Sequence, residues 1–360
     1  MQAVVAYKPN TPLVVEDVEV EKPGAKEVLV RLMASGVCHS DWHIIKGEWG
    51  DALFPLILGH EGAGIVEEVG SDVRHVKPGD HVILAWRSSC GICEMCQKGW
   101  PVLCNASPTV HARPKLRGSD QRLAGAAGLG TMAEYILVPD VAAVLIDEDI
   151  PFAQAALVGC GVTTGVGAVI NTAKVEPGST VAVFGCGGVG LNCIQGAVIA
   201  GAEQIIAVDM LDNKLEMGRT FGATHTVNAS KGDPVEAIRE LTGGQGVHYA
   251  FEAIGLVAAP FLQAIQCTRK RGFTVWVGHA PLNTMVTIDA RTLMQEKTVI
   301  GSMYGSARPH IEFPRLLDLY KRGKLRLDEL ITRRYKLGEA QEAFVALSKG
   351  EVARSVLTIG

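Results

Sequence analysis

Short apolar runs alternate with helical patterns through the second half of the chain. Residues 180–184 form a β-branched apolar run, which is typical of a strand covered on both faces. Residues 191–200 are rich in small apolar side chains and indicate a helix, and residues 204–208 indicate the next strand. The pattern continues with a strand at 247–252, a helix at 257–266 and a strand at 272–277. This order predicts a doubly wound parallel sheet between about 162 and 301.

The first 85 residues carry a different pattern, in which Val-rich alternating runs are broken by Pro and Gly. Runs of this kind predict an antiparallel β domain of the small-barrel type. They lie at 13–20, 27–33, 64–69 and 81–84. The polar stretch from Cys104 to Gly130 indicates an irregular surface loop. The last residues indicate two amphipathic helices, at 313–323 and 338–349, and a final strand at 355–359 that returns to the first domain.

A chain of 360 residues is long enough for two domains, each with its own core. We therefore expect an α/β protein with a β-rich domain at residues 1–161, to which residues 304–360 return. The doubly wound domain is expected at residues 162–303. A strand near 284–288 is a candidate for edge-to-edge pairing between two subunits.

Charge and cysteine content narrow the classes of function. The formal net charge is −4 and no long basic run occurs, so nothing electrostatic favours nucleic acid or an acidic membrane. The N-terminus lacks the basic region and apolar core of a secretory signal, and no apolar run is expected to reach the length of a membrane span. We expect a cytoplasmic protein, whose nine cysteines are metal ligands or buried thiols rather than disulfides.

The turn after the strand at 180–184 is a candidate dinucleotide site. Its G-x-G-x-x-G motif contains Gly185, Gly187, Gly188, Val189 and Gly190. The glycines permit a tight turn and a close approach of the backbone to a pyrophosphate, and Asp209 ends the next strand about 20 residues later. A plain glycine-rich turn is the alternative, because glycine is common in this chain. Strand, helix, strand and acid in the correct order favour the dinucleotide site.

Four cysteines lie close together in one segment, at Cys90, Cys93, Cys96 and Cys104. Four thiolates in a short loop complete the closed tetrahedral shell of a structural zinc. An iron–sulfur cluster shares the first spacings, but such motifs place the fourth cysteine nearer and follow it with Pro, whereas Asn105 stands here. Unliganded thiols are the third interpretation. A closed site of four sulfurs would hold a loop and perform no chemistry.

Cys38, His60 and Cys160 form a second candidate set, dispersed along the chain. A catalytic zinc takes three protein ligands and keeps a fourth position open, and two thiolates with one imidazole meet that requirement. Spacing alone does not bring these residues together. Taken singly, buried core thiols and a hydrogen-bonded histidine are the simpler interpretations.

Three motifs together resemble the signature of the zinc-dependent medium-chain alcohol dehydrogenases. They are Gly59-His60-Glu61-x-x-Gly64-x5-Gly70, the cysteine loop and the glycine turn, which stand in the order of that family over essentially the whole chain. The resemblance implies a GroES-like catalytic domain, a Rossmann domain for NAD, and two zinc ions per chain, one catalytic and one structural. It also implies a homo-oligomer, and the long loop after Cys104 favours a dimer.

The resemblance assigns roles around the catalytic zinc. Cys38, His60 and Cys160 match its ligands, and Glu61 matches the acidic neighbour behind the metal. Asp41 matches the carboxylate that orients the ligating imidazole.

Three further residues match the substrate side of that site. Ser40 matches the hydroxyl that bonds the substrate oxygen, and His43 matches the outer histidine of a proton relay. Trp86 matches an aromatic position in the substrate pocket. The implied reaction is hydride transfer from an alcohol to NAD, with the proton leaving through Ser40 and His43.

A second group matches the cofactor contacts of the family. His39 and Arg354 match side chains that hold the pyrophosphate, where the first position is often Arg. Asp209 matches the acid that bonds the adenosine ribose, and Lys214 a nearby basic partner. The nicotinamide is expected beside Thr164 and the backbone of Val277 and Gly278. Asp209 favours NAD over NADP, since a 2′-phosphate would meet like charge with no Arg at positions 210 or 211.

The substrate remains open between primary alcohols (allylic, aromatic or aliphatic) and the S-hydroxymethyl adduct of a thiol such as glutathione. Glu48 or Asp51 could contact a charged thiol, whereas His43 and Trp86 favour an ordinary alcohol. A polyol dehydrogenase is disfavoured because Cys160 is present. A binding protein without turnover is disfavoured because the zinc ligands and the glycine turn are intact.

Overall fold

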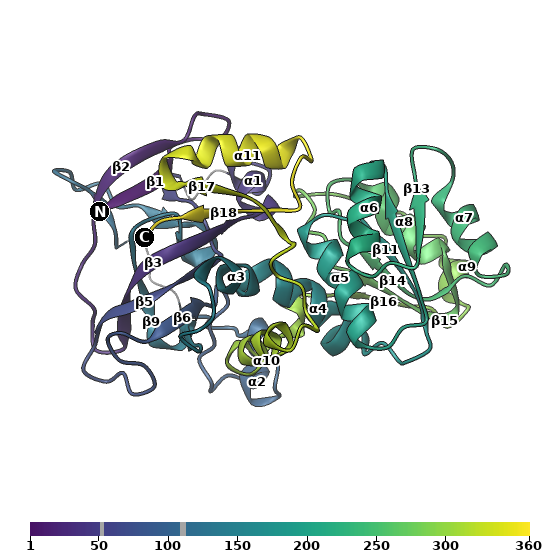
Figure 1. The fold of residues 1–360 in the computed structure, drawn as a ribbon, viewed down its shortest axis with the longest axis horizontal. Coiled ribbons are helices and arrows are strands. Elements are labelled where there is room, and N and C mark those ends of the chain that lie inside the picture. Colours follow the sequence, from purple (N-terminus) through teal and green to yellow (C-terminus); the bar gives the residue numbers. More distant parts are fainter. Residues whose placement is uncertain (51–53, 109–112) are drawn as a thin grey trace. The chain divides into compact units, whose positions relative to one another are not determined.

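The computed structural model describes residues 1–50, 54–108 and 113–360, which fold into two compact units (Figure 1). One unit consists of residues 1–160 and 308–360, and the other of residues 161–307. Each unit has its own sheets and its own apolar core, which is the usual property of a domain.

The first unit is built on the long strand β3 (Glu27–Val37), whose partners are β5 (Gly62–Val69), β9 (Tyr135–Pro139) and β18 (Arg354–Thr358). The same sheet continues through β6 (His81–Leu84), β10 (Ala143–Leu145) and β17 (Ile331–Lys336). Ser355 of β18 lies opposite Val37 of β3 in antiparallel register. This pairing joins the C-terminal residues to the first unit, so the predicted final strand and its return are confirmed.

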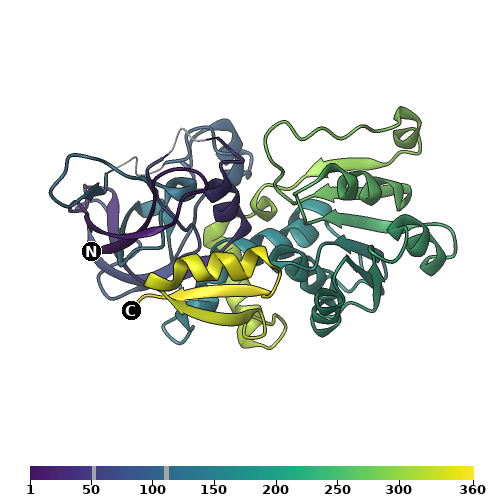
Figure 2. The ribbon, with the colours of Figure 1, turned by 90° about the horizontal axis from the view of Figure 1, so that it is seen from above.

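A smaller sheet in the same unit contains β7 (Lys115–Leu116), β2 (Val14–Glu19), β1 (Gln2–Ala6), β4 (Leu56–Ile57) and β8 (Ala124–Gly125), in that order. The stretch expected to be an irregular loop therefore carries two short strands, β7 and β8. The α-helices are α1 (His39–Lys46), α2 (Glu94–Gln97), α3 (Phe152–Leu157), α10 (Pro309–Lys321) and α11 (Ala340–Ser348). The helix α11 lies along β17 and β18 (Figure 2), and its Phe344 is fully buried.

The second unit contains one parallel sheet of six strands. Their order is β13 (His225–Asn228), β12 (Gln204–Asp209), β11 (Thr180–Phe184), β14 (Val247–Glu252), β15 (Thr268–Trp276) and β16 (Thr298–Gly301). Counted from β11, this is the 3-2-1-4-5-6 order of a dinucleotide-binding sheet. The predicted doubly wound α/β fold is confirmed.

The burial of β11 explains why its sequence lacks alternation. Val181, Ala182 and Val183 are all fully buried, because crossover helices cover both faces of a parallel sheet. The helices of this unit are α4 (Thr163–Gly167), α5 (Gly188–Ile199), α6 (Asp212–Thr220), α7 (Pro234–Leu241), α8 (Ala258–Gln266) and α9 (Ala290–Leu293).

Residues 284–288 have no partner strand within the single chain, where the outer strand on that side of the sheet is β16, so their pairing between subunits stays a prediction. One sequence-based expectation was wrong. The helical stretch Phe152–Ala173 has the length and apolarity of a membrane span, although no run was expected to reach that length. However, 94% of its most apolar window is buried inside the protein, as in a core helix. This helix contains many small residues, Ala and Gly among them, and their size lets neighbouring elements pack closely against it.

Candidate functional site

The structure brings the dispersed set Cys38, His60 and Cys160 together, with Glu61 beside them. The ligand atoms of these four residues all lie within 4.8 Å of one another, and all four side chains are buried. Cys38 follows β3, His60 precedes β5, and Cys160 lies in the helical turn Val158–Val162. Strands β3 and β5 pair with Ser35 opposite Gly62, and this register places Cys38 and His60 at the same end of the sheet.

Asp41 orients the imidazole of His60. Its Oδ2 lies 3.1 Å from His60 Nδ1, and its Oδ1 accepts a hydrogen bond of 3.0 Å from the backbone N–H of Gly59. Burial lowers the pKa of His60, but the nearby charges of Asp41 and Cys38 outweigh burial and raise this pKa. A proton held on Nδ1 by the carboxylate leaves Nε2 as the ligand atom, which is the usual arrangement behind a zinc-bound histidine.

The two thiols of the site share one hydrogen bond. The Cys160 thiol donates to Cys38 and lowers the pKa of Cys38 well below its ordinary value, and the same bond raises the pKa of Cys160. Burial opposes the ionisation of both groups. Two cysteine sulfurs and one imidazole form the donor set of a catalytic zinc with an open position, and a bound metal would displace the proton of Cys160, so these residues fit the ion.

Arg354 and Glu61 form a buried ion pair next to these ligands. Arg354 Nη2 donates to Glu61 Oε2, and neither side chain is more than 5% exposed. Burial raises the pKa of Glu61, and the guanidinium group opposes that rise. The arginine expected to hold a pyrophosphate therefore contacts the acid behind the metal site, and its contact with a cofactor stays a prediction.

The four clustered cysteines also converge. All four sulfur atoms lie within 4.8 Å of one another; the Cys93 sulfur is 3.5 Å from that of Cys96 and 3.8 Å from that of Cys104. Hydrogen bonds from the backbone N–H of Cys96 and Asn105 lower the pKa of Cys93 to about 6. Burial and the neighbouring Cys93 raise the pKa of Cys96 to about 12. Four sulfurs at these distances fit a closed, structural zinc site.

Helix α1 carries the residues expected on the substrate side. It begins at His39, which is exposed, and Ser40 and His43 follow on its first turns. His43 is buried, its Nδ1 hydrogen-bonds Glu48 Oε2, and its ring stacks on Trp49 with centroids 5.0 Å apart. The Glu48–His43 bond was not anticipated from the sequence. The sequence signal for it is a glycine followed by an acid directly after the helix.

Trp86 stands next to the metal ligands. Its ring lies edge-on to that of His60, with centroids 6.3 Å apart and an angle of 80° between the planes. Trp86 follows β6, whose partner β5 begins two residues after His60. Trp86 therefore lies beside the candidate metal site, and its place in a substrate pocket stays a prediction.

The glycine turn of the second unit has the shape of a pyrophosphate cradle. Gly185 has φ = +93°, and a Cβ at Gly190 would lie 1.7 Å from the Gly185 carbonyl oxygen, so neither position accepts a side chain. A Cβ at Gly187, in contrast, would meet nothing within 4 Å. The space within 4 Å of this position is open, and α5 begins at the next residue without a side-chain cap at its N-terminus. These residues fit a dinucleotide.

Asp209 ends β12 beside this turn. Its Oδ2 accepts a 2.8 Å bond from the N–H of Cys186, and its Oδ1 accepts a 3.1 Å bond from the N–H of Leu211. Lys214 lies on the first turns of α6 and is buried, and burial lowers its pKa while Asp209 opposes that change. The bonds to Asp209 fix the carboxylate at the carboxyl edge of the sheet, where dinucleotides bind.

Glu252 is a buried acid at the same edge that sequence reasoning missed. Its backbone carbonyl accepts hydrogen bonds from Val277 N–H at 2.8 Å and Gly278 N–H at 2.9 Å. Its side-chain Oε1 accepts 2.9 Å bonds from Ile254 and Gly255. Glu252 therefore joins the loops after β14 and β15, including the backbone expected beside the nicotinamide. Thr164, the other expected contact, is half-buried in α4. A single acid at the end of an apolar strand is the only signal for Glu252 in the sequence.

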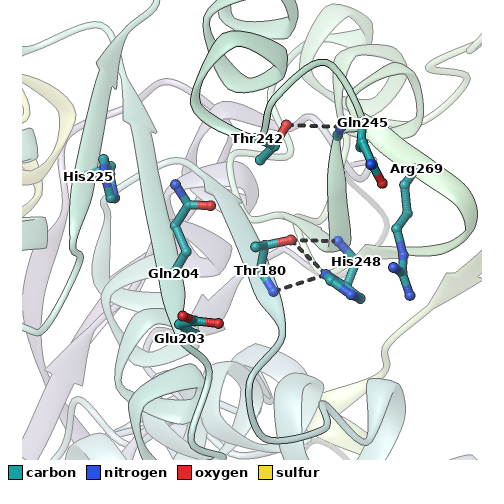
Figure 3. Close-up of a pocket in the computed structure, with 9 residues that line it drawn as sticks. Thr180, Glu203, Gln204, His225, Thr242, Gln245, His248 and Arg269 are labelled. Carbon is teal, nitrogen blue, oxygen red and sulfur yellow. Dashed lines mark hydrogen bonds between the residues drawn. The ribbon is translucent and has the colours of Figure 1, made fainter.

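A hollow of about 500 Å³ opens at the opposite edge of the parallel sheet (Figure 3). It is lined by Thr180, Glu203, Gln204, His225, Thr242, Gln245, Gly246, His248 and Arg269. Thr180 donates through its N–H (3.1 Å) and its hydroxyl (2.7 Å) to Nδ1 of His248, which fastens β14 to β11. None of the expected cofactor residues lines this hollow, because it lies at the amino ends of the strands.

Comparisons with known proteins agree with this arrangement. Residues 24–148 match the alcohol dehydrogenase GroES-like domain, and residues 188–322 match the zinc-binding dehydrogenase family. The class-3 alcohol dehydrogenase of Dictyostelium discoideum is 37% identical, over 99% of this chain and 97% of that protein. The S-(hydroxymethyl)glutathione dehydrogenase of Paracoccus denitrificans is 38% identical, over 99% of each.

Solved structures lead to the same family. Benzyl alcohol dehydrogenase from Acinetobacter calcoaceticus superposes with a TM-score of 0.93 at 32% identity, covering 100% of this chain and 99% of that one. The alcohol dehydrogenase of Aeropyrum pernix superposes with a TM-score of 0.84 at 29% identity, covering 99% and 100%. With two cysteine-containing metal sites and a dinucleotide fold, this chain belongs to the zinc-dependent medium-chain alcohol dehydrogenase family and is an NAD-dependent zinc enzyme.

Proposed function

We propose that this enzyme interconverts primary alcohols, aromatic and allylic ones among them, and the corresponding aldehydes with NAD. The observation that carries the proposal is the convergence of three buried ligands, Cys38, His60 and Cys160, beside the ring of Trp86. The open position of such a site accepts one small oxygen ligand. The similarity to a benzyl alcohol dehydrogenase supports an aromatic substrate.

A substrate panel tests this proposal. Benzyl, cinnamyl and butyl alcohols are compared by kcat/KM with NAD, in the parent and in Trp86→Ala. Aromatic pairs contribute about 0.5–1.5 kcal/mol beyond burial, so the variant is expected to lose about 2–10-fold more on benzyl alcohol than on butanol. Equal losses on both substrates would remove Trp86 from the substrate pocket. No turnover of any alcohol would refute the proposed function.

Different residues of the chain have separate roles in the proposed reaction. When bound, zinc supplies a Lewis acid for the alcohol oxygen and NAD accepts the hydride. Cys38, His60 and Cys160 hold the ion, and Asp41 keeps the Nδ1 proton on His60. Ser40 is proposed to take the hydroxyl proton and His43 to carry it toward solvent.

NAD rather than NADP is the proposed cofactor. The Asp209 carboxylate is fixed at the edge of the sheet by two backbone N–H groups, and Met210 and Leu211 follow it. A ribose 2′-hydroxyl can donate to this carboxylate, whereas a 2′-phosphate would be repelled by it. Kinetic comparison of the two cofactors tests the assignment.

An S-hydroxymethyl-thiol adduct is the second candidate substrate. It is favoured by relatives of 37–39% identity whose names are class-3 alcohol dehydrogenase and S-(hydroxymethyl)glutathione dehydrogenase. In this chain the carboxylate of Glu48 is engaged by His43, and Asp51 lies outside the described residues. Turnover of formaldehyde with and without glutathione or mycothiol separates the two. Rapid oxidation only in the presence of the thiol would replace the first candidate.

Self-association and a cytoplasmic location are also proposed. One edge of β16 has no partner strand within the described residues, and Met285, Met294 and Ile300 are exposed in or near that part of the chain. A homodimer that pairs these edges would cover them. Light scattering of the parent and of Ile300→Lys tests this, with a monomeric variant as the expected result.

The nine unbridged cysteines favour a reducing compartment.

A further inference from the structure

The end of helix α1 places an acid directly on the histidine of the proposed proton path. Gly47 follows the helix with φ = +71°, and its N–H donates 2.8 Å to the Ile44 carbonyl. The N–H of Glu48 donates 3.0 Å to the His43 carbonyl. These two bonds form a Schellman motif, in which the side chain after the glycine commonly makes a hydrophobic contact with the residue five positions earlier. Here the two side chains are Glu48 and His43.

The contact between them is a hydrogen bond, from His43 Nδ1 to Glu48 Oε2. The histidine side chain is 4% exposed and the glutamate side chain is 35% exposed, so the carboxylate lies where the buried ring meets water. An ionised carboxylate accepts hydrogen bonds and donates none. The proton of the neutral imidazole therefore stays on Nδ1, and Nε2 keeps a lone pair. Trp49, stacked at 5.0 Å with 19° between the planes, holds the plane of the ring.

We propose that Glu48 is a positioning residue for proton transfer: it keeps His43 in the tautomer whose Nε2 accepts the proton released by the alcohol. This inference rests on the proposed function, because it requires that His43 carries that proton. In this proton step, one proton moves onto Nε2 of His43 and one proton is later released from the ring to water. The step itself transfers no electrons.

Glu48→Ala and Glu48→Gln separate the hydrogen bond from the charge. Alanine removes the acceptor and is expected to lower kcat for alcohol oxidation about 10-fold, with KM changed less than about twofold, the size of effect seen when an orienting partner is lost. Glutamine can still accept from Nδ1 through its oxygen, so a smaller loss is expected. Glu67→Ala, which removes another partly exposed carboxylate that pairs with Arg31, is the matched control and should retain the parent rate.

A double-mutant cycle with His43→Gln distinguishes positioning from a structural effect. If Glu48 acts only through His43, Glu48→Ala adds nothing to the loss already caused by His43→Gln. If the rate loss of the double variant equals the product of the two single losses, the proposal is overturned, since Glu48 would then act elsewhere. Thermal unfolding is expected to be unchanged in Glu48→Ala, because both backbone bonds of the helix end remain. If the alanine variant does not fold, the same double-mutant cycle is measured with Glu48→Gln in its place.

Nitrogen-15 NMR of histidine side chains in the zinc-loaded enzyme gives a readout that does not depend on turnover. The parent is expected to show His43 protonated on Nδ1, and Glu48→Ala is expected to shift it toward the Nε2-protonated form. An unchanged tautomer in the alanine variant would refute the inference. If the parent oxidises no alcohol, or if His43→Gln keeps the full rate, the proposed function or its proton path fails instead.

Discussion

The buried acid Glu252 is expected to make the stability of the folded protein depend on pH. Its side chain is fully buried, and burial raises its pKa from 4.5 to about 7, although N–H groups of the two loops lower it in part. The folded protein therefore binds a proton here more tightly than the unfolded chain does. Below about pH 4.5 both states are protonated, and the stabilisation from this group is fully present. It is lost as pH rises from 4.5 to about 7.

The size of the effect follows from that shift. One pKa unit corresponds to about 1.4 kcal/mol, so the loss between pH 4.5 and pH 8 is about 3 kcal/mol, as an order of magnitude. Glu252→Gln removes the titration and resembles the protonated acid, since its oxygen can still accept from Ile254 and Gly255. The variant is expected to match the parent near pH 5 and to exceed it by about 1–3 kcal/mol at pH 8.

Hydrogen exchange of the loops around Glu252 measures this directly. The amides of Ile254, Gly255 and Gly278 report the free energy of local opening, and their protection is compared in parent and variant from pH 5 to pH 8, after correction for intrinsic exchange. In the parent, protection is expected to weaken across this range, and in Glu252→Gln it is expected to stay constant. Equal pH dependence in the two proteins would refute the reasoning. Glu203→Gln, at the opposite edge of the sheet, is the control.

Three further outcomes are expected. Cys104→Ser should bind about one zinc fewer per chain and unfold at a lower temperature while it still turns over alcohol, as elemental analysis and calorimetry would show; an unchanged metal content would contradict the structural site. Asp209→Gly should lose about 10–100-fold in affinity for NAD relative to NADP, as fluorescence titration would show, because hydrogen bonds to a charged group contribute about 1.5–3 kcal/mol. Removal of zinc by a chelator should abolish alcohol oxidation, and added zinc should restore it; activity that survives at zero metal content would exclude the catalytic site.

Much of the second unit was predictable from local pattern. The strand Val247–Glu252 coincides with its predicted range, and the glycine turn lies directly after β11 as expected. Buried parallel strands and the turns that join them depend on consecutive residues, so a short window contains the information. The strand expected at 284–288 has no partner strand within the single chain, so its pairing between subunits stays a prediction.

Local pattern did not bring Cys38, His60 and Cys160 together. Nothing local distinguishes Cys38 or Cys160 from a buried core thiol, and a role for both came only from resemblance to a family. The register of β3 and β5 and the helical turn around Cys160 bring their sulfur atoms to within 4.8 Å of His60. The ion pair of Arg354 with Glu61 was also missed, because it joins residues that are 293 positions apart.

Local patterns were enough to predict the two kinds of unit, the glycine turn with its acid, and the loop of four cysteines, because each depends on residues close together along the chain. The folded chain was needed to show which dispersed side chains share a site, that Arg354 pairs with Glu61, and that Glu48 binds His43. Burial and strand register act between distant residues, so a short window of sequence does not contain them. They set the distances, charges and protonation states from which the chemistry of this enzyme follows.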